Sequence, residues 1–266
     1  MQYVPAMPSY QLDEDQKRCW DQNGYALLRH CLSSQETTAL QQWTRELSEW
    51  PETPDAWMKY FESQAKLLCR VENFIPYHPA LKAFLLDKNL LGFLTSLMGE
   101  EAILFKEKIN FKLPGGSGFA PHQDAPAFTT FNQNYHITMM VAIDPSTTSN
   151  GCLDVVDGMH NQGLLGQATD GTIDASIIEA LAWRPIEMEP GDVLFFDSYV
   201  PHRSGPNMSQ DARRALYITY NRASEGDCRE QYYRHKREVF PPEIERIAGI
   251  DYSQGAQTYN LANPIR

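Results

Sequence analysis

The sequence predicts a mostly β domain, a β-sandwich or jelly roll that is supported by helices placed early in the chain. Two observations lead to this prediction. Up to about residue 101 the apolar side chains recur at helical spacing, whereas from residue 102 the pattern changes to short strands separated by turn residues. With 266 residues, 42% of them hydrophobic and 11% aromatic, the chain can bury the core of one large domain or at most two.

We expect a single domain over residues 1–266, because no repeat, low-complexity stretch or linker rich in proline and glycine divides the chain. Residues 1–101 are expected to form a helical buttress with substrate-side segments, residues 102–222 the jelly-roll core and residues 223–266 a C-terminal extension. The mixed charge of residues 222–237 favours a solvated tail or an oligomer contact in that part of the chain.

Two helices are predicted in the N-terminal region. Ser33 and Glu36 fit a capping box at the start of the first helix, and Pro51 ends it after a run of apolar residues at helical spacing. The second helix is predicted over residues 79–98, with Gly99 closing it. Both are interpreted as scaffold, because their apolar residues are of the kind that packs against a sheet.

From residue 102 onward the pattern predicts strands. Residues 137–143, 193–196 and 215–220 are apolar stretches of strand length. Residues 163–183 are expected to form a long loop with a short helix over residues 174–182. The stretch from 103 to 111 alternates, which predicts one face made of Phe105, Glu107, Ile109 and Phe111 and the opposite face made of Lys106, Lys108 and Asn110.

The most informative feature is His122-Gln123-Asp124, followed by His202 and, eleven residues further on, by Arg213. On a strand, a spacing of two places His122 and Asp124 on one face and Gln123 on the other. Two imidazoles and one carboxylate can bind one face of an octahedral ferrous ion and leave three positions for a co-substrate and dioxygen. Zn(II) fits the same ligands, so the ligand types alone do not decide the metal. Arg213 supplies a planar, permanently charged group that suits the carboxylate of a keto acid.

These motifs resemble the phytanoyl-CoA dioxygenase family of Fe(II)/2-oxoglutarate-dependent oxygenases. The resemblance covers residues 106–220 well and the helical N-terminal region loosely. It implies a double-stranded β-helix, or jelly roll, with helices against it. The matching stretches are Pro121-His122-Gln123-Asp124, Asp157-Gly158-Met159-His160, Pro190-Gly191-Asp192-Val193-Leu194-Phe195, and His202-Arg203-Ser204-Gly205-Pro206-Asn207 with Arg213.

The resemblance implies that His122, Asp124 and His202 bind iron and that the chain is a dioxygenase. 2-Oxoglutarate would chelate the iron through its keto acid end, and O2 would take the last position once the substrate binds. The products would be succinate, carbon dioxide and a substrate hydroxylated at an unactivated C–H bond, with ascorbate as the expected reductant. Asp124 favours hydroxylation over halogenation, because halogenases of this kind carry Gly or Ala in place of the carboxylate.

The resemblance also implies a set of residues for the co-substrate. Arg213 would bind the distal carboxylate of 2-oxoglutarate, Ser204 would add a hydroxyl to it, and Asn110 would offer a side-chain amide. Lys106 and Lys108 share the predicted face of Asn110, so either could contact co-substrate or substrate. We group Lys106 with the co-substrate and Lys108 with the substrate.

The substrate is predicted from residues 57–62 and 70–74, which mix aromatic, cationic, acidic and amide side chains. Such a mixture suits a small zwitterion, since cations and amides bind an anionic group and an aromatic face binds an ammonium. These segments, with the strand of Lys106 and Lys108, resemble the bacterial subgroup that hydroxylates 2-aminoethylphosphonate or its N-methylated analogues next to phosphorus. The candidate substrate-binding residues are Lys59, Tyr60, Arg70, Asn73 and Lys108.

Other functions stay open at this point. The chain could hydroxylate a natural product, a zwitterionic osmolyte or a fatty acyl group, or it could be a non-catalytic jelly-roll binding protein. A net charge of −11 disfavours nucleic acid or an anionic membrane as a partner, and no segment approaches the ~20 apolar residues of a membrane span. Five scattered cysteines without a C-x-x-C pair, and a start without a signal-peptide pattern, predict a reduced cytoplasmic protein. The oligomeric state is unknown from the sequence.

Overall fold

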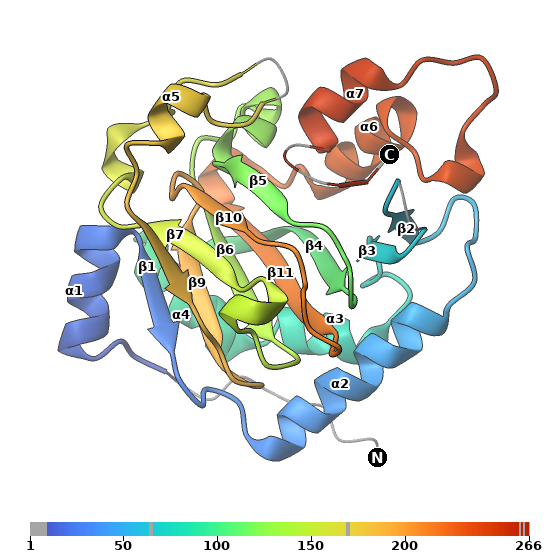
Figure 1. The fold of residues 1–266 in the computed structure, drawn as a ribbon. Coiled ribbons are helices and arrows are strands. Elements are labelled where there is room, and N and C mark those ends of the chain that lie inside the picture. The colour runs from blue at the N-terminus through green and yellow to red at the C-terminus, as the bar shows by residue number, and fades with distance from the viewer. Residues whose placement is uncertain (1–9, 64–65, 169–170, 261, 263, 266) are drawn as a thin grey trace.

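The computed structural model describes residues 10–63, 66–168, 171–260, 262 and 264–265. Its strands form two antiparallel sheets, with helices α2, α3 and α4 against the larger sheet and α6 and α7 at one end (Figure 1). This is the jelly roll with flanking helices that the sequence predicts. The helices are α1 (Glu14–Asn23), α2 (Ser34–Glu49), α3 (Pro79–Leu85), α4 (Lys88–Met98), α5 (Ala175–Ile178), α6 (Arg229–Val239) and α7 (Ser253–Tyr259).

The two sheets differ in size, and the chain crosses between them repeatedly. In spatial order, the seven-stranded sheet contains β1 (Tyr25–Leu28), β9 (Val193–Asp197), β6 (His136–Ala142), β11 (Arg213–Arg222), β4 (Ala102–Lys112), β3 (Leu68–Glu72) and β2 (Met58–Phe61). The four-stranded sheet contains β5 (Phe119–His122), β10 (His202–Ser204), β7 (Leu153–Val156) and β8 (Trp183–Ile186).

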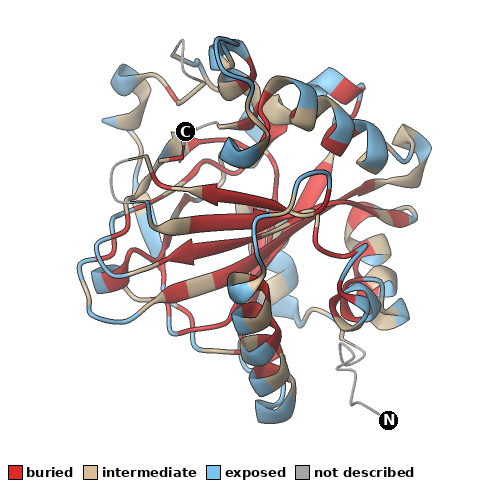
Figure 2. Cartoon of the chain, turned by 90° about the vertical axis from the view of Figure 1, so that its right-hand side faces the viewer, coloured by how far each residue is buried: buried red, intermediate tan, exposed pale blue. Residues whose placement is uncertain are grey.

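The central strands are apolar on both faces because both faces are covered. On β6, Ile137, Met139 and Val141 pack with the helices, whereas Met140 and Ala142 pack toward the smaller sheet. The strands β9 and β11 alternate in the same way. Figure 2 shows the result, with buried strands in the middle and exposed residues on the outer sides of the helices. A continuous apolar run is therefore the expected pattern for these strands.

The first of the two predicted helices is α2, and its predicted start and end are confirmed. Ser33 caps α2, since its Oγ accepts from the backbone N–H of Glu36 at 3.3 Å while the Glu36 carboxylate accepts from the N–H of Ser33 at 2.6 Å. The helix ends at Glu49, ahead of Pro51. Its buried face consists of Thr37, Leu40, Trp43, Thr44 and Leu47.

The single helix predicted over residues 79–98 is wrong, because the structure has two. The first, α3, ends at Leu85, and Asp87 then caps α4 by accepting from the backbone N–H groups of Asn89 and Leu90. An Asp side chain competes well for free helical N–H groups, so it begins a new helix here in place of continuing the old one. Gly99 ends α4 in the left-handed conformation, as predicted.

The strict alternation predicted for residues 103–111 fails at Phe105. The pairing of β4 with β11 skips this residue, which leaves a β-bulge. Phe105 therefore packs in the cluster of Phe128, whose ring also lies 4.5 Å from the Lys106 ammonium, and not in the cluster of Ile109 and Phe111. From Lys106 onward the alternation holds, so Lys108 and Asn110 line one pocket.

The two ends of the chain contribute more to the core than the sequence indicates. The interpretation of residues 1–101 as helical is wrong in part, because they also supply β1, β2 and β3 to the larger sheet. The interpretation of residues 222–237 as a solvated tail is wrong too, since α6 packs on the sheet and fully buries Lys236. The helix predicted over residues 174–182 is only the short α5.

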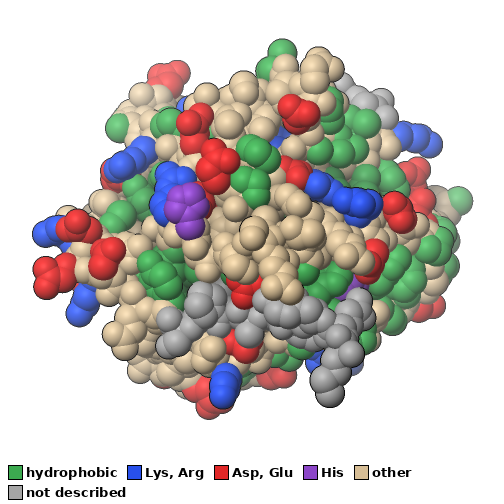
Figure 3. Space-filling view, turned by 90° about the horizontal axis from the view of Figure 1, so that it is seen from below, with side chains coloured by type: hydrophobic (Ala, Val, Ile, Leu, Met, Phe, Trp, Pro, Cys, Tyr) green, Lys and Arg blue, Asp and Glu red, His purple; other side chains and the backbone are tan. Residues whose placement is uncertain are grey.

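The surface that Figure 3 shows carries interspersed acidic and basic side chains. No helix among the described residues is both long and apolar enough to cross a bilayer.

Candidate metal and co-substrate site

The three predicted ligands come together at the smaller sheet. His122 ends β5 and pairs with His202, the first residue of β10, so their ring centroids lie 4.1 Å apart. Asp124 follows two residues after His122, and its Oδ1 lies 3.9 Å from His122 Nε2. One ligand atom from each residue lies within 4.8 Å of the others. The arrangement has the size and donor set of a site for one divalent metal ion.

Both imidazoles are oriented by the backbone. The Nδ1 atom of His122 lies 2.8 Å from the Ala120 carbonyl oxygen, and that of His202 lies 3.0 Å from the Val200 carbonyl oxygen. A carbonyl can only accept, so each Nδ1 carries the proton and each Nε2 keeps a lone pair for a metal. Burial lowers the pKa of His122 to about 3 and also lowers that of His202. Neutral imidazoles are the form that binds metal ions.

Asp124 is the anionic member of the set. Burial by itself would raise the pKa of Asp124, but the interactions of its carboxylate with His202, Lys108 and Lys106 hold it below the ordinary value. Thr138 Oγ1 lies 3.4 Å from the Asp124 carboxylate and donates to it. The residue itself has helical backbone angles, φ −75° and ψ −30°, because β5 has already ended. The shared direction of His122 and Asp124 thus comes from a strand end followed by a turn.

Gln123 lies between the ligands and points away from them. Its amide nitrogen donates to the carbonyl oxygens of Gly163 at 2.9 Å and Tyr199 at 2.7 Å, and its Oε1 accepts from the Leu165 N–H at 2.8 Å. The side chain is buried and connects three segments that meet behind the ligands.

A pocket between the two sheets contains the ligands together with several other predicted residues. Asn110, Ser204 and Lys108 share this pocket with the three ligands, as the sequence predicts. Its lining consists of Lys108, Asn110, Phe119, His122, Asp124, Leu153, His202, Arg203, Ser204 and Tyr217.

Arg213, fully buried at the start of β11, is not among the residues that line this pocket, but it contacts Tyr217, which is. Its Nη2 donates to the Gly151 carbonyl and its Nη1 to the Tyr217 hydroxyl at 3.4 Å. Its Nε is buried and has no partner among the described residues. An unsatisfied guanidinium N–H is costly in a protein interior, so the donor set fits an anionic ligand group next to it.

The sequence interpretation missed Lys112, which lies beside Arg213. Its ammonium donates to Ser204 Oγ at 2.7 Å and to the carbonyl oxygens of Gly151 at 3.1 Å and Gly205 at 2.5 Å. A signal was present, because Lys112 continues the alternation of Lys108 and Asn110 by one more step. The interpretation ended at residue 111 and so left it out.

Lys106 and Lys108 lie close enough to Asp124 for their charges to act on its carboxylate. The Lys106 ammonium sits 4.5 Å from the centre of the Phe128 ring, and that of Lys108 sits 5.4 Å from the Tyr217 ring. Neither forms a hydrogen bond or a close ion pair with another described residue. Burial lowers the pKa of both ammonium groups, and Asp124 opposes that change in each.

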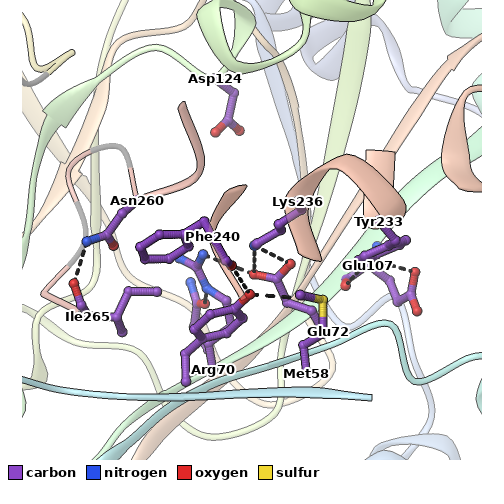
Figure 4. Close-up of polar contacts among 12 residues, drawn as sticks. Met58, Arg70, Glu72, Glu107, Asp124, Tyr233, Lys236, Phe240, Asn260 and Ile265 are labelled. Carbon is purple, nitrogen blue, oxygen red and sulfur yellow. Dashed lines mark hydrogen bonds and ion pairs between the residues drawn. The ribbon is translucent and has the colours of Figure 1, made fainter. Parts of the chain in front are cut away.

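The charges of Glu72 and Arg70 act on both lysines, and these two residues belong to a buried ion network that Figure 4 shows. Arg70 donates to Asn110 Oδ1 at 3.2 Å and to Glu72 at 3.1 Å, and Lys236 of α6 binds both oxygens of Glu72 at 2.7 Å. Burial would raise the pKa of Glu72, but Lys236 and Arg70 lower it to about 2. In Figure 4 the Asp124 carboxylate is turned toward this network.

Three residues predicted for the substrate are not brought to the pocket. Lys59 donates to two carbonyls at the C-terminal end of α2, at 2.9 and 2.7 Å. Tyr60 donates its hydroxyl to the Phe240 carbonyl at 3.0 Å, and Asn73 accepts from Arg229 at 3.2 Å. Their side chains hold neighbouring elements together. Composition alone could not separate them from Arg70, which does reach Asn110.

The sequence is similar to the sequences of known proteins. The sequence profile described as phytanoyl-CoA dioxygenase (PhyH) matches residues 20–215. The chain belongs to the phytanoyl-CoA dioxygenase family. It is therefore a non-heme iron, 2-oxoglutarate-dependent dioxygenase that acts on a small molecule, and the alternative of a non-catalytic binding protein falls away.

Two curated relatives of this dioxygenase act on phosphorus compounds, by their names. The chain is 52% identical over 257 residues to the 2-aminoethylphosphonate dioxygenase of the uncultured bacterium HF130_AEPn_1, covering 95% of this chain and 98% of the relative. It is 45% identical over 231 residues to the methylphosphonate hydroxylase of Gimesia maris, covering 86% and 88%.

Among solved structures, the dioxygenase resembles EctD from S. alaskensis with 2-oxoglutarate and 5-hydroxyectoine. The TM-score is 0.73 at 22% identity, over 84% of this chain and 81% of that one. This likeness shows that the two proteins share a fold.

Proposed function

We propose that this dioxygenase hydroxylates the carbon next to phosphorus in a small organophosphonate, with 2-aminoethylphosphonate and its N-trimethyl analogue as first candidates. The observation that carries the proposal is the pair Lys106 and Lys108, two cations beside Asp124 without a hydrogen bond or close ion pair to a described residue. A phosphonate group has up to two negative charges and three acceptor oxygens, so it can bind both ammonium groups at once. The names of the two relatives support the same substrate class.

In this proposal, His122, Asp124 and His202 hold the iron through two Nε2 atoms and a carboxylate oxygen. Arg213 and Ser204 bind the distal carboxylate of 2-oxoglutarate. Iron with 2-oxoglutarate and dioxygen supplies the oxidising chemistry, in which the substrate is hydroxylated and 2-oxoglutarate leaves as succinate and carbon dioxide.

The role of Lys106 and Lys108 is to orient the substrate. Both lie close enough to Asp124 for their charges to lower its pKa. A phosphonate held by them has its neighbouring carbon near the metal, because only one bond separates that carbon from phosphorus. Asn110, on the same face as Lys108, is held by Arg70 and offers a further polar contact for co-substrate or substrate. Holding reacting groups in one orientation is a large part of catalysis.

There is less support for a specific binding group for the amino group of the substrate. Asp124 and Glu72 are the carboxylates whose charges act on both lysines, and Glu72 is already bound by Lys236 and Arg70. A substrate ammonium would have to share it with two protein cations. We therefore propose that the phosphonate end dominates recognition, and that a substrate without an amino group, such as methylphosphonate, is the second candidate. The relative named methylphosphonate hydroxylase supports including it.

We further propose a cytoplasmic location, with ascorbate as a useful reductant in the assay. The support for the first point is that all five cysteines are free: Cys19, Cys31, Cys69, Cys152 and Cys228.

The test is succinate formation by the iron-loaded enzyme with 2-oxoglutarate, ascorbate and one candidate substrate at a time. We expect stimulation by 2-aminoethylphosphonate, its N-trimethyl analogue or methylphosphonate. The matched controls are β-alanine and taurine, which replace the phosphonate by a carboxylate or a sulfonate, and both should leave the rate at its background. Stimulation by ectoine, a carnitine-like amine or an acyl-CoA, without stimulation by any phosphonate, contradicts the proposed substrate.

A further inference from the structure

Two buried cations lie side by side and contact residues that line the pocket. Lys112 on β4 is paired directly with Arg213 on β11, so their side chains leave the sheet on the same face. Both donate to the carbonyl oxygen of Gly151. The exposed fractions are 2% for Lys112 and 1% for Arg213. Neither has a carboxylate within ion-pair distance among the described residues.

The backbone around Lys112 is arranged to receive an ammonium group. Its three acceptors, on Ser204, Gly151 and Gly205, equal the three N–H groups of a protonated lysine. Gly151 has a φ of 75°, and a Cβ there would lie 2.1 Å from the Gly205 oxygen and 2.9 Å from Lys112 Nζ. Only glycine allows this approach, so the contact depends on a specific backbone conformation.

The charge balance around Lys112 lacks an anion. Burial first, and then the charge of Arg213, lower the pKa of Lys112 to about 6. The other groups that act on it are Cys69, Cys152 and Glu62, and their effect is in the opposite direction but smaller. Above about pH 6, Lys112 carries its proton beside Arg213 only when a compensating negative charge is close by. The neighbouring Ser204 lines the pocket that holds the three ligands, so the missing anion can come from a ligand bound there.

We propose that Lys112 is a second cation of the subsite for the distal carboxylate of 2-oxoglutarate, where it positions Ser204 and takes up a proton from solvent when that carboxylate binds. The inference rests on the co-substrate assignment made above for Arg213. Arg213 supplies the direct contact through its free Nε, and Lys112 supplies charge and holds the Ser204 hydroxyl.

The experiment is calorimetric binding of two keto acids to the full-length, Mn(II)-loaded enzyme without organophosphonate. The first ligand is 2-oxoglutarate, and the second is 2-oxopentanoate, which has the same keto acid end but a methyl group in place of the distal carboxylate. We expect Lys112→Met to weaken 2-oxoglutarate binding about tenfold or more, because a charge-assisted interaction is lost. Binding of 2-oxopentanoate should stay within about twofold, since that interaction was never made.

Three variants serve as comparisons. Arg213→Met should show the same selective loss, larger in size. Lys82→Met changes an exposed lysine and should bind both keto acids as the wild type does. Lys112→Gln keeps a donor for Ser204 without the charge, and it serves if Lys112→Met unfolds, as thermal melting will show. Equal weakening of both keto acids by the Lys112 variants means a merely structural role and overturns the inference.

Proton uptake on binding is measured with the wild-type enzyme alone. Each keto acid is titrated into it at pH 7.5 in two buffers that differ in ionisation enthalpy. We expect net proton uptake with 2-oxoglutarate and none with 2-oxopentanoate. Binding of 2-oxoglutarate without proton uptake overturns the inference even if every Lys112 variant is unstable. Failure of the metal-loaded wild type to bind either keto acid argues instead against the proposed function.

Discussion

The orientation of the two ligand imidazoles depends on single carbonyl groups, each two residues earlier in the chain. His122 Nδ1 is hydrogen-bonded to the Ala120 carbonyl oxygen and His202 Nδ1 to that of Val200, so the same local interaction orients both rings. The residue types were predictable from the sequence, because few side chains bind iron and they occur here with Arg213 at the expected place. The hydrogen bonds that select the Nε2 atoms were not, because they depend on backbone that only the folded chain supplies.

Replacing a ligand should remove the metal and the activity together. We expect Asp124→Asn and His122→Ala to abolish iron retention and substrate-dependent succinate formation, because a metal needs the anionic oxygen and both imidazoles. Metal analysis after gel filtration and the succinate assay are the measurements, with circular dichroism to check the fold. Turnover at the wild-type rate in either variant would disprove the assignment.

Lys108 provides a prediction that separates substrate from co-substrate. Lys108→Met should raise the KM for the phosphonate about tenfold or more, because a charge-assisted contact is lost. The binding of 2-oxoglutarate should change by less than about twofold if Lys108 serves only the substrate. The expected pattern is the reverse of that for Lys112→Met, so each variant is the control for the other. A rise in the 2-oxoglutarate requirement alone would move Lys108 to the co-substrate.

Among the helices and strands, the site depends on segments that the sequence did not predict as strands of the larger sheet or as a packed helix. The strands β2 and β3 add to the edge of the larger sheet, and α6 packs against them. Lys236 of α6 looked like part of a solvated charge pattern, yet it is buried against Glu72 and lies 4.9 Å from the Tyr60 ring. A charged residue can be recognised as buried only when its partner is known, and Glu72 is 164 residues away.

The Glu72–Lys236 pair should control the stability of this end of the molecule. We expect Glu72→Gln to lower the free energy of unfolding by about 3 kcal/mol, because it leaves a buried ammonium without its counter-charge. Adding Lys236→Met to that variant should restore part of the loss, since the unpaired charge is then gone. Denaturant unfolding of the two single variants and the double variant measures this. A double variant that loses the sum of the single losses contradicts the coupling.

The same pair predicts a dependence on pH. The folded-state pKa of Glu72, about 2, is lower than the ordinary value of 4.5, so the unfolded chain binds more protons between these values. The stabilisation from Glu72 is therefore present above pH 4.5 and is lost as the pH falls toward 2. Unfolding free energies at descending pH should decline less steeply in Glu72→Gln than in the wild type. Equal slopes would show that Glu72 is not held as proposed.

For the whole molecule, the fold class was predictable because the change from helical spacing to short strands appears directly in the apolar pattern. Two details of the fold could not be predicted, because each depends on the conformation of a single residue. A bulge at Phe105 changes the face of one side chain, and a cap at Asp87 divides a helix without interrupting its apolar character. The strands β2 and β3 could not be predicted, because a pattern of four or five residues is too short to distinguish a strand from the end of a helix.

The charge of the whole molecule also matters for function. The chain has a net charge of −11, yet the buried side chains around the pocket include an excess of cations. Binding both 2-oxoglutarate and the proposed phosphonate, two small anions, needs such a locally basic interior on an acidic protein. These cations are the buried Lys106, Lys112, Arg70 and Arg213, together with Lys108, which is half-buried and lines the pocket.

Hydroxylation of the carbon next to phosphorus can be observed by phosphorus NMR of the complete reaction. We expect the resonance of 2-aminoethylphosphonate to be replaced by one new phosphonate resonance whose proton coupling shows a hydroxyl-bearing carbon on phosphorus. That product should form in equal amount to succinate. Succinate formed while the phosphorus spectrum of every phosphonate tested stays unchanged would contradict the proposed function, and it would leave a dioxygenase with a different substrate.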